Sequence, residues 1–284
     1  MQQKHQEAID FLNDYIDKNP YCEVAWHQIG RQYSVLKRYE EALIAYDFAV
    51  IIDESFVGGY LEKAKALEEL GEYKEAIENY LITLELDDAT AFAFIRIGEC
   101  HQKLENYDTA ILYYQKAVHE DPLLDKGWLF LANLYLDQKN YEKASYSIAK
   151  ALKIDESNSL YWRRYSEIKL KLSFFEEAIN GFKKCLFLGD DDVNTFIALS
   201  DVLAFIGEFE EALSVLFKAQ KMHINLAEIE YRLAALSLIL NKKKIGTIHL
   251  INGMKIDYEC HICLLYTSDA ADDLLCVDLG GRRI

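Results

Sequence analysis

Alanine returns at one fixed interval along most of the chain. The seven positions are 34 residues apart, and they are Ala8, Ala42, Ala76, Ala110, Ala144, Ala178 and Ala212. An aromatic residue stands three positions before all but the first alanine, at Tyr39, Tyr73, Tyr107, Tyr141, Phe175 and Phe209. A fixed period of roughly 20–50 residues is typical of architectures built from stacked, similar units. The sequence therefore predicts a stack of such units along one axis.

Each unit has the apolar pattern of two amphipathic helices. The first helix has a stripe at spacings i, i+3, i+4 and i+7, formed in one unit by Trp128, Leu131, Ala132 and Tyr135. Because the tryptophan and tyrosine positions recur with the repeat, we expect them to lie in the core. A second stripe of the same kind follows at Tyr141, Ala144, Ser145 and Ile148. The link over residues 137–140 is so short that it favours an antiparallel helix pair. Pro20 and Pro122 fall at the same phase of the repeat, where one unit is expected to end.

The residues that recur resemble those of the tetratricopeptide repeat family. Its pattern W-x2-L-G-x2-Y followed by A-x3-F is matched by Trp26, Ile29, Gly30, Tyr33, Ala42 and Tyr46. The resemblance covers about residues 1–259. It implies an all-α fold, a right-handed α-solenoid of antiparallel helix pairs whose first helices line a concave surface.

The register also predicts the domain organisation. Residues 1–22 are expected to form the second helix of a partial repeat, followed by six units over 23–56, 57–90, 91–124, 125–158, 159–192 and 193–226. Residues 227–262 are interpreted as a degenerate seventh unit, because Glu230, Lys243 and Gly246 replace the tryptophan, aromatic and alanine positions. Residues 263–284 lack the repeat phase and resemble a translated sequencing adaptor, so we interpret them as a non-native tail.

Composition and charge exclude several classes of function. The net charge of −16 makes binding to nucleic acid unfavourable, since polyphosphates are held by basic surfaces. No apolar run approaches the roughly 18 residues of a membrane helix, and no signal peptide precedes the repeats, so we expect no membrane partner and a cytoplasmic location. Cys260 and Cys263 form the one C-x-x-C pair, which is too few ligands to predict a metal site.

The resemblance places candidate partner contacts on the inner face of the first helices. These residues are His27, Gln28, Arg31, Glu62, Lys65, Arg96, Glu99, Phe130, Asn133, Arg163, Arg164, Glu167, Asp201 and Arg232. One interpretation is a cationic stripe for peptide carboxylates. The alternative is that neighbours at i, i+3 satisfy each other, as Glu62 with Lys65, Arg96 with Glu99 and Arg164 with Glu167 would.

No catalytic constellation is visible in the sequence, and a non-catalytic scaffold is the leading hypothesis. The seven histidines occupy unrelated repeat phases, and no glycine-rich phosphate loop or nucleophile motif accompanies them, so we expect no cofactor. The expected partner is a protein or peptide bound in the groove. Two alternatives stay open, an accessory region of a larger enzyme or sensor whose catalytic domain is missing from this fragment, and a structural spacer.

Two further expectations concern single segments. The run from Asp190 to Asp192 is expected to cap a helix that begins near Val193, because acids are favoured at a helix N-terminus. A solenoid without polar caps exposes the apolar faces of its end units, so self-association through the ends is expected.

Overall fold

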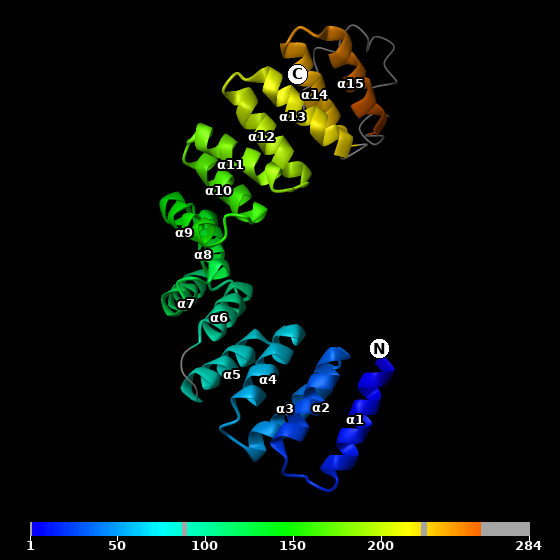
Figure 1. Cartoon of the computed structure of the whole chain (residues 1–284), viewed down its shortest axis with the longest axis vertical. Coiled ribbons are helices and arrows are strands. Elements are labelled where there is room, and N and C mark those ends of the chain that lie inside the picture. Colours follow the sequence, from blue (N-terminus) through cyan, green and yellow to red (C-terminus); the bar gives the residue numbers. More distant parts are fainter. Residues whose placement is uncertain (1, 87–89, 223–225, 257–284) are drawn as a thin grey trace. The chain divides into compact units, whose positions relative to one another are not determined.

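The computed structural model describes residues 2–86, 90–222 and 226–256 (Figure 1). The tail over residues 263–284 and the pair Cys260 and Cys263 lie outside the described residues. The described part contains fifteen α-helices and no strand, and none of these helices is long and apolar enough to span a membrane.

The helices belong to two compact units. Unit 1 covers residues 1–154 and contains α1 Gln2–Ile16, α2 Glu23–Val35, α3 Tyr39–Ile52, α4 Val57–Leu70, α5 Tyr73–Leu86, α6 Ala91–Lys103, α7 Tyr107–Glu120, α8 Asp125–Asp137 and α9 Tyr141–Ile154. Unit 2 begins at Asp155 and contains α10 Ser159–Lys171, α11 Phe175–Phe187, α12 Val193–Phe205, α13 Phe209–Met222, α14 Ala227–Ile239 and α15 Lys243–Ile256. The even-numbered helices are first helices of the repeat and the odd-numbered ones are second helices.

Paired helices lie side by side within each unit (Figure 1). The predicted all-α fold, a solenoid built from antiparallel helix pairs, is confirmed. The repeated alanines explain the close approach of the paired helices, since a large side chain there would hold them apart. Six of them have no exposed surface, namely Ala42, Ala76, Ala110, Ala144, Ala178 and Ala212.

Large and small residues also alternate across the helix contacts of unit 1. The rings of Tyr46, Tyr80 and Tyr114 on second helices are fully buried. Opposite Tyr114 lies Gly98, where a Cβ atom would stand 2.5 Å from the tyrosine Cε1. Glycine at this position therefore makes room for the ring of the following helix.

A recurrent turn joins the first helix of each pair to the second. One residue in each turn has a positive φ, and these residues are Lys37, Gly71, Glu105, Lys139, Ser173, Gly207 and Asn241, again 34 residues apart. The next amide bonds back to a carbonyl five residues earlier, as in the 2.7 Å bond from Asn140 N to Tyr135 O. This is the hydrogen bond of a Schellman helix end, which requires the left-handed conformation.

The tryptophans differ from the expectation that they fill the core. Trp26, Trp128 and Trp162 are only half-buried. Each indole Nε1 donates a hydrogen bond to the carbonyl oxygen six residues earlier, at Pro20 (3.0 Å), Pro122 (3.1 Å) and Glu156 (2.8 Å). The tryptophan thus covers the link that leads into its helix, because its amphipathic ring can pack with one edge and donate with the other.

Helices α14 and α15 form a further pair despite their departures from the repeat. Glu230, which replaces the tryptophan, is buried, and its Oε2 lies 2.7 Å from Nδ1 of the buried His249. Gln220 donates a hydrogen bond to the same carboxylate. A buried carboxylate needs such partners, so this polar cluster takes the place of the aromatic ring.

Candidate functional site

The candidate contacts fall into two groups, because four of the first helices belong to unit 1 and three to unit 2. Helices α2, α4, α6 and α8 hold His27, Gln28, Arg31, Glu62, Lys65, Arg96, Glu99, Phe130 and Asn133. Helices α10, α12 and α14 hold Arg163, Arg164, Glu167, Asp201 and Arg232.

On α2 the three candidates have different surroundings. The His27 ring makes an edge contact with Phe56, with centroids 5.2 Å apart, and its Nε2 atom is buried without a hydrogen-bond partner. Burial lowers the pKa of His27; the charge of Glu62 raises it in part, and Arg31 and Lys65 lower it. Neutral His27 is therefore part of the wall between α2 and α4, whereas Arg31 is exposed and has no ion pair within the described residues.

The candidates of α4 and α6 form ion pairs within and between helices. Lys65 lies 2.9 Å from Glu62, and Arg96 lies 2.8 Å from Glu99. These are two of the i, i+3 pairs that the alternative interpretation predicted, and the structure confirms them. Arg96 also pairs with Glu68 of α4, which lies 28 residues earlier.

Aromatic rings join the same face. The Lys65 ammonium lies 5.5 Å from the centroid of the half-exposed Phe92 on α6. On α8, Phe130 stacks on Tyr114 with centroids 5.1 Å apart. Burial raises the pKa of Tyr114 well above its usual value, so this phenol stays neutral and donates to Gln102 at 3.0 Å. Side chains of the first helices α4 and α6 thus touch each other, whereas Phe130 of α8 contacts Tyr114 of the second helix α7.

The three candidate arginines of unit 2 each pair with a carboxylate. Arg164 lies 2.7 Å from Glu167, the third predicted i, i+3 pair. Arg232 pairs with Glu228 at 3.1 Å and with Asp201 of the preceding first helix. Burial raises the pKa of Asp201, and the charge and hydrogen bond of Arg232 lower it in part.

Arg163 has a structural partner that the sequence did not indicate. It pairs with Asp192, whose side chain accepts a 2.9 Å hydrogen bond from the Asn194 amide at the start of α12. The predicted cap of this helix is confirmed, with Asp192 as the capping residue. The first acid of the run, Asp190, accepts a 2.6 Å hydrogen bond from the Thr195 hydroxyl.

The sequence analysis missed the contact partners that come from a neighbouring repeat. Glu68, Phe92 and Tyr114 contact the candidates, yet none lies within one helical turn of its partner. A search at separations of 28 to 31 residues would have found Glu68 with Arg96 and Asp201 with Arg232.

The fold and this face define a helical-repeat protein of the solenoid class. Family models of the tetratricopeptide repeat match residues 57–89, 91–122 and 125–158. The chain carries tetratricopeptide repeats, as the resemblance implied. No curated protein matches the chain significantly in sequence.

Solved structures share the fold at low sequence identity. The C-terminal part of a repeat-containing protein from Cytophaga hutchinsonii is 16% identical, with a TM-score of 0.73 over 87% of this chain and 99% of that one. YrrB, described as a tetratricopeptide protein with an unusual peptide-binding site, is 19% identical, with a TM-score of 0.56 over 66% of this chain and 96% of YrrB. PilF of Pseudomonas aeruginosa is 17% identical, with a TM-score of 0.58 over 80% and 97% of the two chains. These neighbours show the shared fold, and the repeats support a general role as a protein-interaction scaffold.

Proposed function

We propose that the chain is a non-catalytic scaffold that binds a segment of a partner polypeptide on its first-helix face. In unit 1 this face consists of the nine candidate residues of α2, α4, α6 and α8. The observation that carries the proposal is the contact between two neighbouring first helices, since Glu68 of α4 reaches Arg96 of α6 and Lys65 of α4 reaches Phe92 of α6. The five candidates of unit 2 form a second patch of the same kind.

The charges of the face suit a peptide. Paired carboxylates and cations offer both acceptors and donors for the main chain of a bound segment, because an ion pair leaves part of its hydrogen-bonding capacity unused. Arg31 of α2 is exposed, forms no ion pair with any described residue, and lies beside the half-buried Gln28. An arginine of this kind can hold a carboxylate through two parallel hydrogen bonds. We therefore assign an acidic side chain of the partner to Arg31.

The acidic surface elsewhere argues for a protein partner. With a net charge of −16, the chain repels polyphosphates at long range, whereas a local cation among acids selects a peptide by geometry.

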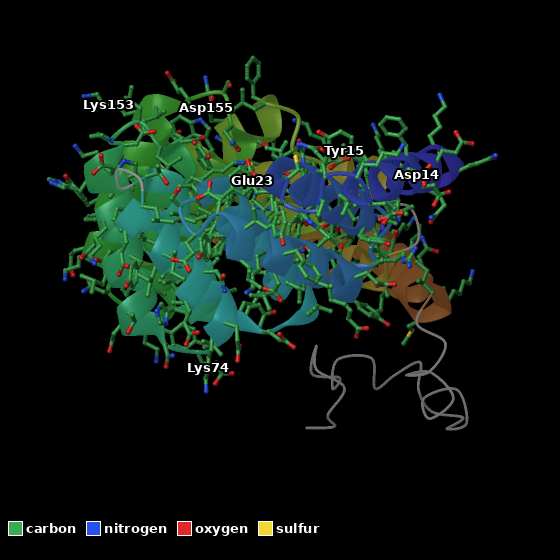
Figure 2. All side chains as sticks on the ribbon, turned by 90° about the horizontal axis from the view of Figure 1, so that it is seen from below. Asp14, Tyr15, Glu23, Lys74, Lys153 and Asp155 are labelled. Atoms are coloured by element: carbon green, nitrogen blue, oxygen red, sulfur yellow. The ribbon has the colours of Figure 1, made fainter. Side chains whose placement is uncertain are left out.

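The test selects peptides from a display library on the full chain and measures their affinity for variants by fluorescence polarisation. Arg31→Glu should weaken the selected peptides by about tenfold or more, the loss expected when one charged contact is reversed. Lys74→Glu is the matched control, because Lys74 is an exposed cation that projects from the second helix α5 (Figure 2).

Equal affinity for wild type and Arg31→Glu, or an equal loss in Lys74→Glu, would contradict the proposal. Circular dichroism of both variants checks that the helices are intact.

A further inference from the structure

A hollow of about 530 Å³ lies between α7, α8 and α9 of unit 1. Its floor is formed by the buried side chains of Val118, Leu131, Tyr135 and Ser147. Trp128 and the largely exposed Tyr146 form its walls, with ring centroids 6.0 Å apart. A volume of this size is within the range of small-ligand pockets.

The hollow is distinct from the first-helix face. Trp128, Leu131 and Tyr135 lie along one side of α8, at spacings of three and four residues. Phe130 and Asn133 of the first-helix face each follow Trp128 or Leu131 by two residues. At 3.6 residues per turn, this spacing places them on roughly the opposite side of the helix. A ligand in the hollow therefore leaves the first-helix face free.

Two other helix pairs hold a large side chain at the equivalent position. One repeat earlier, Tyr113 occupies the phase of Ser147, and its ring stacks on His101 with centroids 5.5 Å apart. In α15 the same phase holds His249, which contacts Glu230. Ser147 is smaller than either of these residues and leaves room for the hollow.

The rim of the hollow also lacks an ion pair that is present at the equivalent position of a helix pair in unit 2. In unit 2, Lys183 and Glu211 stand at the phases of Gln115 and Lys143, and they form an ion pair of 2.7 Å. Gln115 and Lys143 cannot form such a pair, and Lys143 has no ion pair within the part of the chain that the structure describes. Its ammonium lies 5.4 Å from the centroid of the Tyr135 ring.

Two donors point to an acceptor on the ligand. Tyr135 already accepts a 2.7 Å hydrogen bond from Nε2 of Gln115, so the phenol proton can be donated outward. The Lys143 ammonium lacks a carboxylate. The indole of Trp128 is satisfied by Pro122, so Trp128 offers an apolar surface only.

We propose that this hollow binds an aromatic side chain of a partner polypeptide that has an acidic residue next to it. The ring packs against Trp128 and Tyr146 above Ser147, in the offset and edge contacts that aromatic rings prefer. The acidic side chain meets Lys143. Glu142 also lies at the rim and opposes the acid, so its removal should tighten binding.

The probe is the dipeptide N-acetyl-Asp-Phe-amide, added to the full chain labelled with nitrogen-15. The measured signal is the indole resonance of Trp128, assigned by its loss in Trp128→Phe. We expect a saturable shift with a dissociation constant in the low millimolar range, which is suited to a ligand of two residues. N-acetyl-Asn-Phe-amide, which lacks the acid, should bind several-fold more weakly.

Three variants test the assignment of the contacts. Ser147→Tyr fills the hollow as Tyr113 does one unit earlier, and it should weaken binding by about tenfold or more. Tyr146→Ala removes an exposed wall with little risk to folding and should also weaken binding. Lys143→Gln should lower the affinity of the acidic dipeptide to that of the Asn analogue. Glu142→Gln should raise the affinity of the acidic dipeptide.

The proposal is overturned if the Trp128 resonance does not move, or if Ser147→Tyr and Tyr146→Ala bind as wild type does. Equal or tighter binding of 3-phenylpropionate, which carries ring and carboxylate without a peptide, would overturn the polypeptide assignment in favour of a small aromatic acid. Arg31→Glu should leave the Trp128 shift unchanged, so failure of this site and failure of the first-helix face are separate results.

Discussion

A small residue at the repeated alanine position sets the distance between the two helices of a pair. Ala144 is fully buried in α9, whereas Ala149 of the same helix is exposed. Ala144→Leu should overpack the contact and lower the free energy of unfolding by about 1–3 kcal/mol. Ala149→Leu should change it by less than about 0.5 kcal/mol. Urea unfolding followed by circular dichroism measures both, and equal effects of the two would disprove the role assigned to Ala144.

Burial also determines the chemistry of two thiols. It raises the pKa of Cys100 to about 11 and, together with the nearby Asp190, that of Cys185 to about 12. Below its raised pKa a thiol stays protonated, so at pH 8 only about one Cys100 in a thousand carries the reactive thiolate.

We therefore expect iodoacetamide at pH 8 to label the half-buried Cys22 well before Cys100 and Cys185. Raising the pH to 10 should accelerate the two slow sites, as far as the fold survives. Peptide mapping by mass spectrometry gives the rate at each site, and labelling of Cys100 as fast as Cys22 would contradict the burial argument.

The candidate site could be predicted from sequence only where it depends on one helix. The pairs of Lys65 with Glu62 and of Arg164 with Glu167 follow from i, i+3 spacing. The pairing of Arg96 with Glu68 depends on which helices become neighbours, and that is decided by the packing of successive units. The interpretation as a cationic stripe left out Glu68, because this acid stands 28 residues before Arg96 in the sequence.

At the scale of helices and turns, the left-handed residue after each first helix is the feature least visible in the sequence. It is glycine only at Gly71 and Gly207, and elsewhere a lysine, glutamate, serine or asparagine adopts the same conformation. The period of 34 residues predicted the helices because apolar residue types recur. It did not predict this turn conformation, because the residue types at that position do not recur.

This turn gives a prediction at Ser173, which has φ of 62°. The left-handed conformation costs a residue with a side chain about 1–2 kcal/mol, and glycine avoids this cost. Glycine also has a larger entropy in the unfolded chain, which offsets about 0.4–1 kcal/mol of the gain in stability. Ser173→Gly should therefore raise the free energy of unfolding by up to about 1 kcal/mol, measured by urea unfolding. Gly207→Ala, at the same phase, should lower it. A loss of stability in Ser173→Gly would show that the turn is not strained.

At the scale of the whole molecule, exposed apolar residues gather on the last described helix. Ile245, Ile248 and Ile251 of α15 are 42%, 56% and 45% exposed, at intervals of three residues that place them on one side. Such a stripe favours contact with another molecule.

We expect the apparent mass from light scattering to rise with concentration for the wild type and to rise less for Ile248→Lys. Leu112→Lys is the control, because Leu112 is 49% exposed at the same repeat phase on α7 and its neighbours on that side of the helix are polar, namely Asp108, Thr109, Gln115 and Lys116. A wild type that stays monomeric at high concentration would refute self-association through this end.

The two compact units are built on the same 34-residue repeat, and the sequence did not predict the boundary between them. The 34-residue period runs through residues 141–178 without a break, so it predicted one array, whereas the structure divides after Ile154. The periodicity indicates which residues pack within one repeat. It carries less information about how many repeats form one compact body, because that depends on the contacts between successive repeats, which differ along the chain.

The central claim is that the first helices present a binding face to a polypeptide. Its most direct test attaches a nitroxide to a display-selected peptide and maps the loss of backbone amide signals in the nitrogen-15 spectrum of the bound chain. The account predicts losses concentrated on α2, α4 and α6, around Arg31, Lys65 and Arg96. Losses confined to the second helices α3, α5 and α7 would contradict it.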